Sequence, residues 1–229
     1  MPKRLPPVTA ARKQPVQARS TQLVADILAG AIRVLEREGA PRFTTIRVAH
    51  EAGVSVGSLY QYFPNKQAIL FRLQIDEWEA TGATLEALLG DATRAPAQRL
   101  RDTIRAFFHS ECDEAPLRLA LAEAAPAYRD APESSARRRR SNRLVQSFVA
   151  AAAPRATPRQ RRFAAELILA TMTSLGKQVS ERGLARAEVD AWASAAADML
   201  SAYLAQLIPK RRTGRTGQAR HLPTAPDPP

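Results

Sequence analysis

Residues 44–66 gather side chains that can form hydrogen bonds with bases and phosphates. Gln61 can pair with adenine, and Ser58 can bond to several bases. The tyrosine hydroxyls can reach phosphate oxygens, and Lys66 adds a cation. These types and spacings predict a DNA-contacting surface made of Thr44, Thr45, Ser55, Val56, Gly57, Ser58, Tyr60, Gln61, Tyr62 and Lys66.

Two short helices joined by a turn are needed to hold these side chains. Ala49 is small where the helices would touch, and Gly53 supplies the turn. Ser55 can cap a second helix over Val56–Tyr62, which leaves backbone amides that attract phosphate. The pattern predicts a helix-turn-helix over about residues 44–63, with its second helix in the major groove.

The same segment resembles the signature of TetR/AcrR-type bacterial regulators. The matching pattern is Gly53-Val54-Ser55-x-Gly57-x-Leu59-Tyr60-x-Tyr62-Phe63-x-Asn65-Lys66, preceded by Thr44-Thr45 and by Glu38-Gly39. One departure is Val48, where isoleucine is usual. The resemblance is strong over residues 19 to about 75, and beyond them it rests on helical architecture alone.

This resemblance implies a three-helix DNA-binding domain, with a fourth helix leading into a ligand-sensing region. It also implies a homodimer, usually built on the last two long helices, that binds a near-palindromic operator. Most members of the family are repressors that leave DNA when a small molecule binds.

The rest of the chain also has helical periodicity. Apolar residues recur at three- and four-residue steps from about Arg19, and Gly39 is expected to end that first helix. Asn65 can cap a long helix that begins near Lys66. Further helices are expected over about 96–112, 116–125, 133–153, 158–182 and 186–208. We therefore expect an all-α fold of about nine helices, with a C-terminal ligand-binding and dimerisation domain.

Proline and charge divide the chain into four parts. We expect a flexible basic arm over residues 1–18 and the DNA-binding domain over 19–66. A helical regulatory and dimerisation domain follows over 67–208, then a disordered, basic, Pro-rich tail over 209–229. The net charge of +12 is concentrated at the ends: these first two parts carry +6, the next +2 and the tail +4. A polyanionic partner explains this distribution, as would solubility or a compositional preference for Arg.

Indications of a ligand pocket are weaker. The residues that could line a cavity between helices are Phe107, Phe108, His109, Cys112, Thr171, Met172 and Gln178. His109 with Cys112 is too sparse a pair for a metal site, so we expect no metal and no cofactor. Cys112 more often serves as a small buried apolar residue than as a redox sensor.

Three features have alternative interpretations. The apolar stripe from Val189 to Leu207 is either internal core or a dimer interface. Its width favours the interface, with Trp192, Ala196, Met199, Leu200 and Tyr203 as candidate contacts. Tyr60 is about as suited to packing as to touching DNA. The run Arg137–Arg140 is either a solvated face or, less commonly, a nucleic-acid patch.

Enzymes form the main competing class. The sequence has no Gly-rich phosphate loop, no G-x-S-x-G motif and no catalytic spacing of His, Asp and Glu, so we do not expect an enzyme. A non-specific architectural DNA binder would have no need of the balanced middle region.

Compartment follows from composition. One cysteine fits a reducing compartment. No apolar run is long enough for a membrane span and no secretory signal is evident, which predicts a cytoplasmic protein. The expected function is that of a ligand-responsive, sequence-specific transcriptional regulator. Its expected partners are double-stranded operator DNA, an unidentified small-molecule effector and a second copy of the chain.

Overall fold

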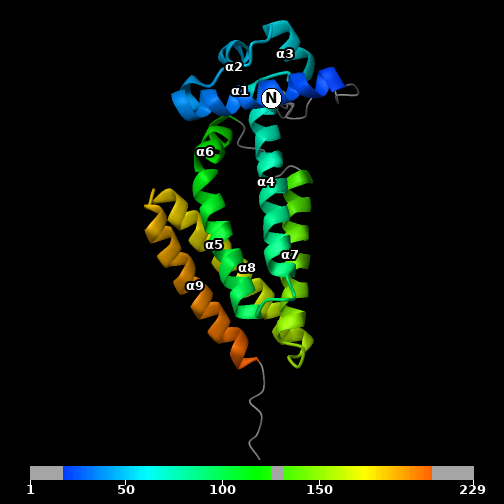
Figure 1. Ribbon diagram of the computed structural model, residues 1–229, viewed down its shortest axis with the longest axis vertical. Helices are drawn as coiled ribbons and strands as arrows, with labels where there is room; N and C mark the ends of the chain where they lie inside the picture. The colour runs from blue at the N-terminus through cyan, green and yellow to red at the C-terminus, as the bar shows by residue number, and fades with distance from the viewer. Residues whose placement is uncertain (1–17, 125–131, 208–229) are drawn as a thin grey trace, which may run out of the picture.

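The computed structural model describes residues 18–124 and 132–207, which form nine α-helices, one 3₁₀ turn and no strand (Figure 1). This confirms the predicted all-α fold. Most of the predicted arm, residues 125–131 and the predicted tail lie outside the described residues. No helix in the described ranges is both long and apolar enough to cross a membrane.

The N-terminal unit consists of three helices at one end of the molecule (Figure 1). They are α1 (Ala18–Glu38), α2 (Thr45–Glu51) and α3 (Val56–Tyr62), with the 3₁₀ turn η1 (Ala40–Arg42) between the first two. Helix α1 packs against α2, which in turn contacts α3.

The body of the molecule is formed by the six remaining helices of the described residues. They are α4 (Lys66–Gly90), α5 (Pro96–Asp113), α6 (Ala115–Ala124), α7 (Pro132–Ala152), α8 (Pro158–Glu181) and α9 (Arg186–Gln206). Helix α5 is central, because it packs on α4, α8 and α9, while α7 lies against α8 and α4. Figure 1 shows α4 descending from the N-terminal unit into this body.

The predicted start and stop signals act as expected. Gly39 and Gly53 have φ angles of 72° and 68°, a left-handed conformation that glycine adopts without strain. The Ser55 hydroxyl accepts a hydrogen bond from the Ser58 amide at 3.0 Å. The Asn65 side-chain oxygen accepts one from the Ala68 amide at 2.8 Å. These caps fix where the recognition segment and α4 begin.

Two apolar cores lie one above the other along α4. The upper core joins α1, α2 and α3 to the first turns of α4, including Ile69 and Leu70, and to Leu117 and Leu121 of α6. The lower core joins α5, α7, α8 and α9 to Leu89 near the end of α4. Packing of the DNA-binding region therefore continues past residue 66, and α4 belongs to both cores.

Candidate functional site

Helix α3 divides cleanly into a packed face and an exposed face. Leu59 is fully buried, and Gly57, Tyr60 and Gln61 are exposed. Val56 and Ser58 are half-buried at the edges of that face. Because the helix is short and capped at Ser55, its exposed side chains and its N-terminal amides present themselves on the same end of the molecule.

Several predicted DNA contacts are linked to one another by their hydroxyl groups. The Thr45 and Tyr60 hydroxyl oxygens lie 3.1 Å apart, which ties the start of α2 to α3. The Ser55 and Ser58 hydroxyl oxygens lie 2.8 Å apart. A hydroxyl that makes one such bond keeps a lone pair or proton for a second partner. These residues are thus positioned before any DNA arrives.

Tyr62 lies elsewhere than we expected. Only 6% of it is exposed, and it packs in the upper core with Leu59 and Phe63. It follows Leu59 by three residues, so it falls on the same buried face of the helix. Among the other candidates, Thr44 is exposed and caps α2, while Lys66 is half-buried at the start of α4.

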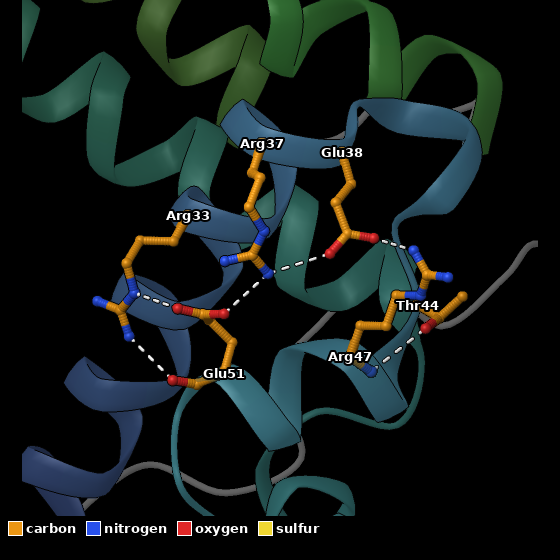
Figure 2. A network of polar contacts seen from close by, with 6 residues as sticks. All are labelled: Arg33, Arg37, Glu38, Thr44, Arg47 and Glu51. Carbon is orange, nitrogen blue, oxygen red and sulfur yellow. Dashed lines mark hydrogen bonds and ion pairs between the residues drawn. The ribbon is translucent and has the colours of Figure 1, made fainter.

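An ionic network holds α2 against the end of α1 (Figure 2). The Arg33 guanidinium donates to the Glu51 carboxylate at 2.8 Å and to its backbone carbonyl at 3.0 Å. Arg37 bridges Glu51 at 2.9 Å and Glu38 at 3.0 Å. The same hydrogen bonds, from Arg33 first and then from Arg37, hold the pKa of the Glu51 carboxyl below its usual value.

A second part of this network reaches the start of α2. Arg47 pairs with Glu38, and its backbone amide donates to the Thr44 hydroxyl at 3.3 Å. Figure 2 shows the two glutamates alternating with the arginines. Sequence analysis did not find this role of Arg47, because a partner nine residues away on another helix leaves no local pattern.

Close contact between α1 and the turn after α2 depends on Gly30. A Cβ built on this glycine would lie 3.0 Å from both the Cβ and the backbone nitrogen of Ala52. Sequence analysis found the small residue Ala49, which is buried, but it missed Gly30. Only the pairing of the two helices reveals the need for glycine there.

Two cavities lie between helices of the body. The α4–α7 cavity has a volume of about 380 Å³, and its lining includes Trp78, Leu85 and Arg137. The α5–α8 cavity, of about 270 Å³, is lined from α4, α5, α7 and α8 and includes Phe107 and Met172. The two share Leu85, Arg137, Ser141 and Leu144, so they are neighbours on either side of α7.

The predicted pocket residues are only partly brought together. Phe107 and Met172 line the α5–α8 cavity, whereas the other five line neither cavity. Phe108 is fully buried, Gln178 is exposed, and Thr171 is half-buried. Helical periodicity indicated which residues face inward on α5 and α8, but it could not indicate where the packing leaves a gap.

His109 contacts a carboxylate and Cys112 is partly buried, and neither lines one of the two cavities. The His109 Nε2 lies 2.7 Å from the Asp190 carboxylate, which Arg105 also contacts at 2.8 Å. Burial raises the pKa of the Cys112 thiol, so less of the reactive thiolate is present. The described residues contain no group of three or more His, Cys, Asp or Glu that could hold a metal ion.

The arginine run on α7 is more than a solvated face. Arg137 lies over the Trp78 ring, with its guanidinium carbon 4.9 Å from the ring centre. Arg140 pairs with Glu86 at 2.5 Å. Both contacts hold α7 against α4, while Arg138 and Arg139 are exposed.

The apolar stripe of α9 has both an internal and an external edge. Ala196 and Leu200 are buried against the lower core at 4% and 1% exposure. Met199 is 55% exposed. Tyr203 is half-buried and stacks edge-on with the exposed Phe163 of α8. Trp192 is half-buried under Arg182.

Comparisons with known proteins give family matches for both parts of the chain. Residues 27–73 match the model described as bacterial regulatory proteins of the tetR family. Residues 95–207 match the model described as tetracyclin repressor-like, C-terminal domain. A comparison with curated protein sequences gave no match.

Solved structures share the whole architecture. A protein with unknown function from Rhodococcus sp. RHA1 is 26% identical, covers 85% of this chain and all of its own, and has a TM-score of 0.64. A TetR-like transcriptional regulator from the same organism is 20% identical, with a TM-score of 0.55 and coverage of 84% and 99%.

A third neighbour has a ligand bound. The transcriptional regulator FadR from Bacillus subtilis, solved in complex with stearoyl-CoA, is 16% identical with a TM-score of 0.54. The match covers 77% of this chain and 96% of that one. With both family matches and the geometry of α1–α3, this chain belongs to the TetR family of DNA-binding transcriptional regulators and is not an enzyme.

Proposed function

We propose that this protein is a sequence-specific repressor that a small-molecule effector releases from a near-palindromic operator. The observation that carries the proposal is the exposed face of α3, which is capped by Ser55 and lies beyond the start of α4. The network of Figure 2 holds the preceding helix α2 against α1, and two cavities lie beside the middle and last turns of α4. Of the predicted DNA contacts, the exposed Gln61 has the amide chemistry to read adenine.

Helix α4 supplies a physical connection between DNA and effector. Its first turns pack with α3 in the upper core, and Trp78 and Leu85 further along line the α4–α7 cavity. An effector that favours one packing of α4 over another would change the position of the whole N-terminal unit. FadR, the neighbour solved with stearoyl-CoA, supports a cavity of this fold as a ligand site.

The operator half-sites would be read by a homodimer. The exposed apolar side chains Phe163 and Met199, with Tyr203 between α8 and α9, support a partner on that face. Met199→Glu is expected to shift the protein toward monomer in analytical ultracentrifugation. The control is Ser194→Glu, because Ser194 is exposed on α9, the helix that carries Met199. Met172→Glu would not serve, because Met172 is buried and the charge would disrupt the core.

Quantitative footprinting on the DNA around its own gene tests the DNA-binding proposal. We expect affinity for one site at least ~10³-fold above random DNA. Gln61→Ala should relax base preference, whereas Lys66→Ala should weaken all sequences and reduce the salt slope by about one. Gln178→Ala and Lys177→Ala, both exposed on α8, are the matched controls. Equal affinity for scrambled duplexes would favour an architectural DNA binder instead.

The division of the chain into an arm, a DNA-binding region, a regulatory region and a tail is also part of the proposal. Deletion of residues 1–18 should lower operator affinity if the arm reaches a minor groove. Unchanged affinity would leave the arm without a role in DNA binding.

A further inference from the structure

The charged lining of the α5–α8 cavity has a single sign. Among the residues that line it, the charged ones are Arg137 and Arg138, and no carboxylate is present. Most of the remaining wall is apolar, with Leu89, Val145 and Met172 among its members. The neighbouring α4–α7 cavity differs, because its lining also contains two carboxylates, those of Glu79 and Glu133, beside its three arginines. An apolar cavity with only cationic charge is suited to an anion with an apolar body.

Arg137 is the half-buried arginine of this wall, and its N–H donors are available to a ligand. Among the described residues it makes no hydrogen bond or ion pair, and its contact is the Trp78 ring at 4.9 Å. Arg138, the other arginine of this wall, is exposed to solvent and donates to the Ser135 hydroxyl at 3.1 Å. A guanidinium above an aromatic ring keeps its N–H donors for an acceptor at its edge.

Nearby carboxylates do not fill that position. Burial lowers the pKa of the Arg137 guanidinium, while the charges of Glu111 and Glu114 act in the opposite direction. Glu111 pairs with Arg118 at 3.1 Å, and Glu114 accepts hydrogen bonds from Gln74 and Thr81. A half-buried guanidinium without a hydrogen-bonded acceptor gains most from an anion that arrives with the ligand.

We propose that the α5–α8 cavity binds an amphipathic organic carboxylate, whose acid group pairs with Arg137 and whose apolar body lies along Leu89, Val145 and Met172. This inference rests on the proposed function, since it gives the chemical class of the effector. Arg137 recognises the carboxylate through two parallel N–H donors, as a guanidinium does and a lysine cannot.

Calorimetric titration of the full-length protein tests the charge requirement. The probes are the straight-chain carboxylates from hexanoate to dodecanoate, with 1-decanol and decylamine matched in length to decanoate. We expect decanoate to bind at least about tenfold more tightly than the alcohol, the ratio that one charge-assisted hydrogen-bond pair supplies. The amine should bind more weakly still.

Variants of α7 assign that preference to a residue. Arg137→Gln should remove the preference for carboxylate over alcohol, and Arg137→Lys should retain part of it. Arg139→Gln, on the same helix but lining neither cavity, should behave as wild type. In a Trp192→Phe background, which leaves Trp78 as the remaining tryptophan, decanoate should change the tryptophan emission. If Arg137→Gln does not fold, the three ligands on wild-type protein still decide.

The outcomes separate this inference from the proposed function. Equal affinity for decanoate, 1-decanol and decylamine, or no binding by any carboxylate of the series, overturns the anionic class while the repressor remains testable by footprinting. Tight, Arg137-dependent carboxylate binding without any operator binding would support Arg137 as the residue that pairs with the acid group and would overturn the repressor.

Discussion

The N-terminal unit and the helical body place their polar groups in opposite ways. In α1–α3 the polar side chains of the recognition helix face outward, on a surface held by ion pairs between helices. In the body, the arginines of α7 turn toward an aromatic ring, a glutamate and the walls of two cavities. The first region reads an external surface, whereas the second can enclose a molecule. Matched substitutions in the two regions test how independent they are.

The largest effects are expected from truncating a core leucine in each region. Leu59→Ala in α3 and Leu200→Ala in α9 remove side chains that are at most 1% exposed, and each should lower stability by about 2–5 kcal/mol. We expect Leu59→Ala to abolish operator binding while most helical circular dichroism remains. Leu200→Ala should instead lower the urea midpoint of the body. Identical unfolding curves for both would show that the two cores melt as one.

Alanine substitutions at two closely packed glycines, one in each region, should change stability by smaller and unequal amounts. The Cβ of Gly30→Ala would meet the backbone of Ala52 at 3.0 Å, whereas that of Gly176→Ala would meet the Phe107 ring at 2.9 Å. Alanine favours a helix by about 1 kcal/mol over glycine at both sites. Phe107 borders a cavity and can shift, so Gly176→Ala should be nearly neutral. Gly30→Ala should lower the free energy of unfolding, measured with urea, by about 1–2 kcal/mol. A larger destabilisation by Gly176→Ala than by Gly30→Ala would contradict this prediction.

Removal of a helix cap should affect the two regions differently, because the capped helices differ in length. Ser55 caps the seven-residue α3, and Thr157 forms a capping box on the 24-residue α8. Replacement of either by alanine should lower stability by about 1 kcal/mol. A short helix depends more on its first turn, so operator affinity should fall for Ser55→Ala alone. A similar loss from Thr157→Ala would mean that α8 also positions the DNA-binding unit.

The smallest effects should come from two of the surface carboxylates whose pKa is lowered, Glu51 and Asp190. Glu51 is held by Arg33 and Arg37, and Asp190 by His109 and then by Arg105. Because the pKa of each carboxyl is lower in the folded state, its ionised form stabilises the fold at pH values above the ordinary pKa, 4.5 for Glu51 and 3.8 for Asp190. This stabilisation is lost as the pH falls through the pKa of the folded state. Glu51→Gln and Asp190→Asn should therefore lower Tm by about 1–3 °C at pH 7.

Melting at acidic pH is the control for Glu51→Gln and Asp190→Asn. Once the wild-type carboxyls are protonated, each variant should melt at the same temperature as wild type. A difference in Tm that persists after further acidification no longer changes it would show that the substituted side chain acts through packing.

Sequence predicted the N-terminal unit in more detail than the body, for a physical reason. Gly53, Ser55 and Asn65 act on backbone groups within three residues, so their roles are written in local spacing. For Tyr62, residue type suggested a phosphate contact, while its position on the helix buries all but 6% of it in the upper core.

In the body, local spacing predicted helices but not their mutual placement. Phe107 and Met172 were identified as pocket residues, yet Arg137 was interpreted as a member of a charge run. Its neighbour Trp78 is 59 positions away along the chain, so that stack is a product of packing α7 on α4. Likewise, the stripe of α9 indicated one broad apolar face, and only the position of α5 separates Leu200 from Met199.

Helix α4 limits how the two regions can be recombined. A hybrid regulator that joined this recognition unit to a foreign sensing region at residue 66 would separate Ile69 and Leu70 from the core they complete. A functional exchange would have to carry α4 whole, together with Leu117 and Leu121 of α6. The exposed side chains of α3 do not pack in this core, so they can be substituted without a matching change elsewhere. Over evolutionary time, operator preference can therefore drift faster than the link between sensing and release.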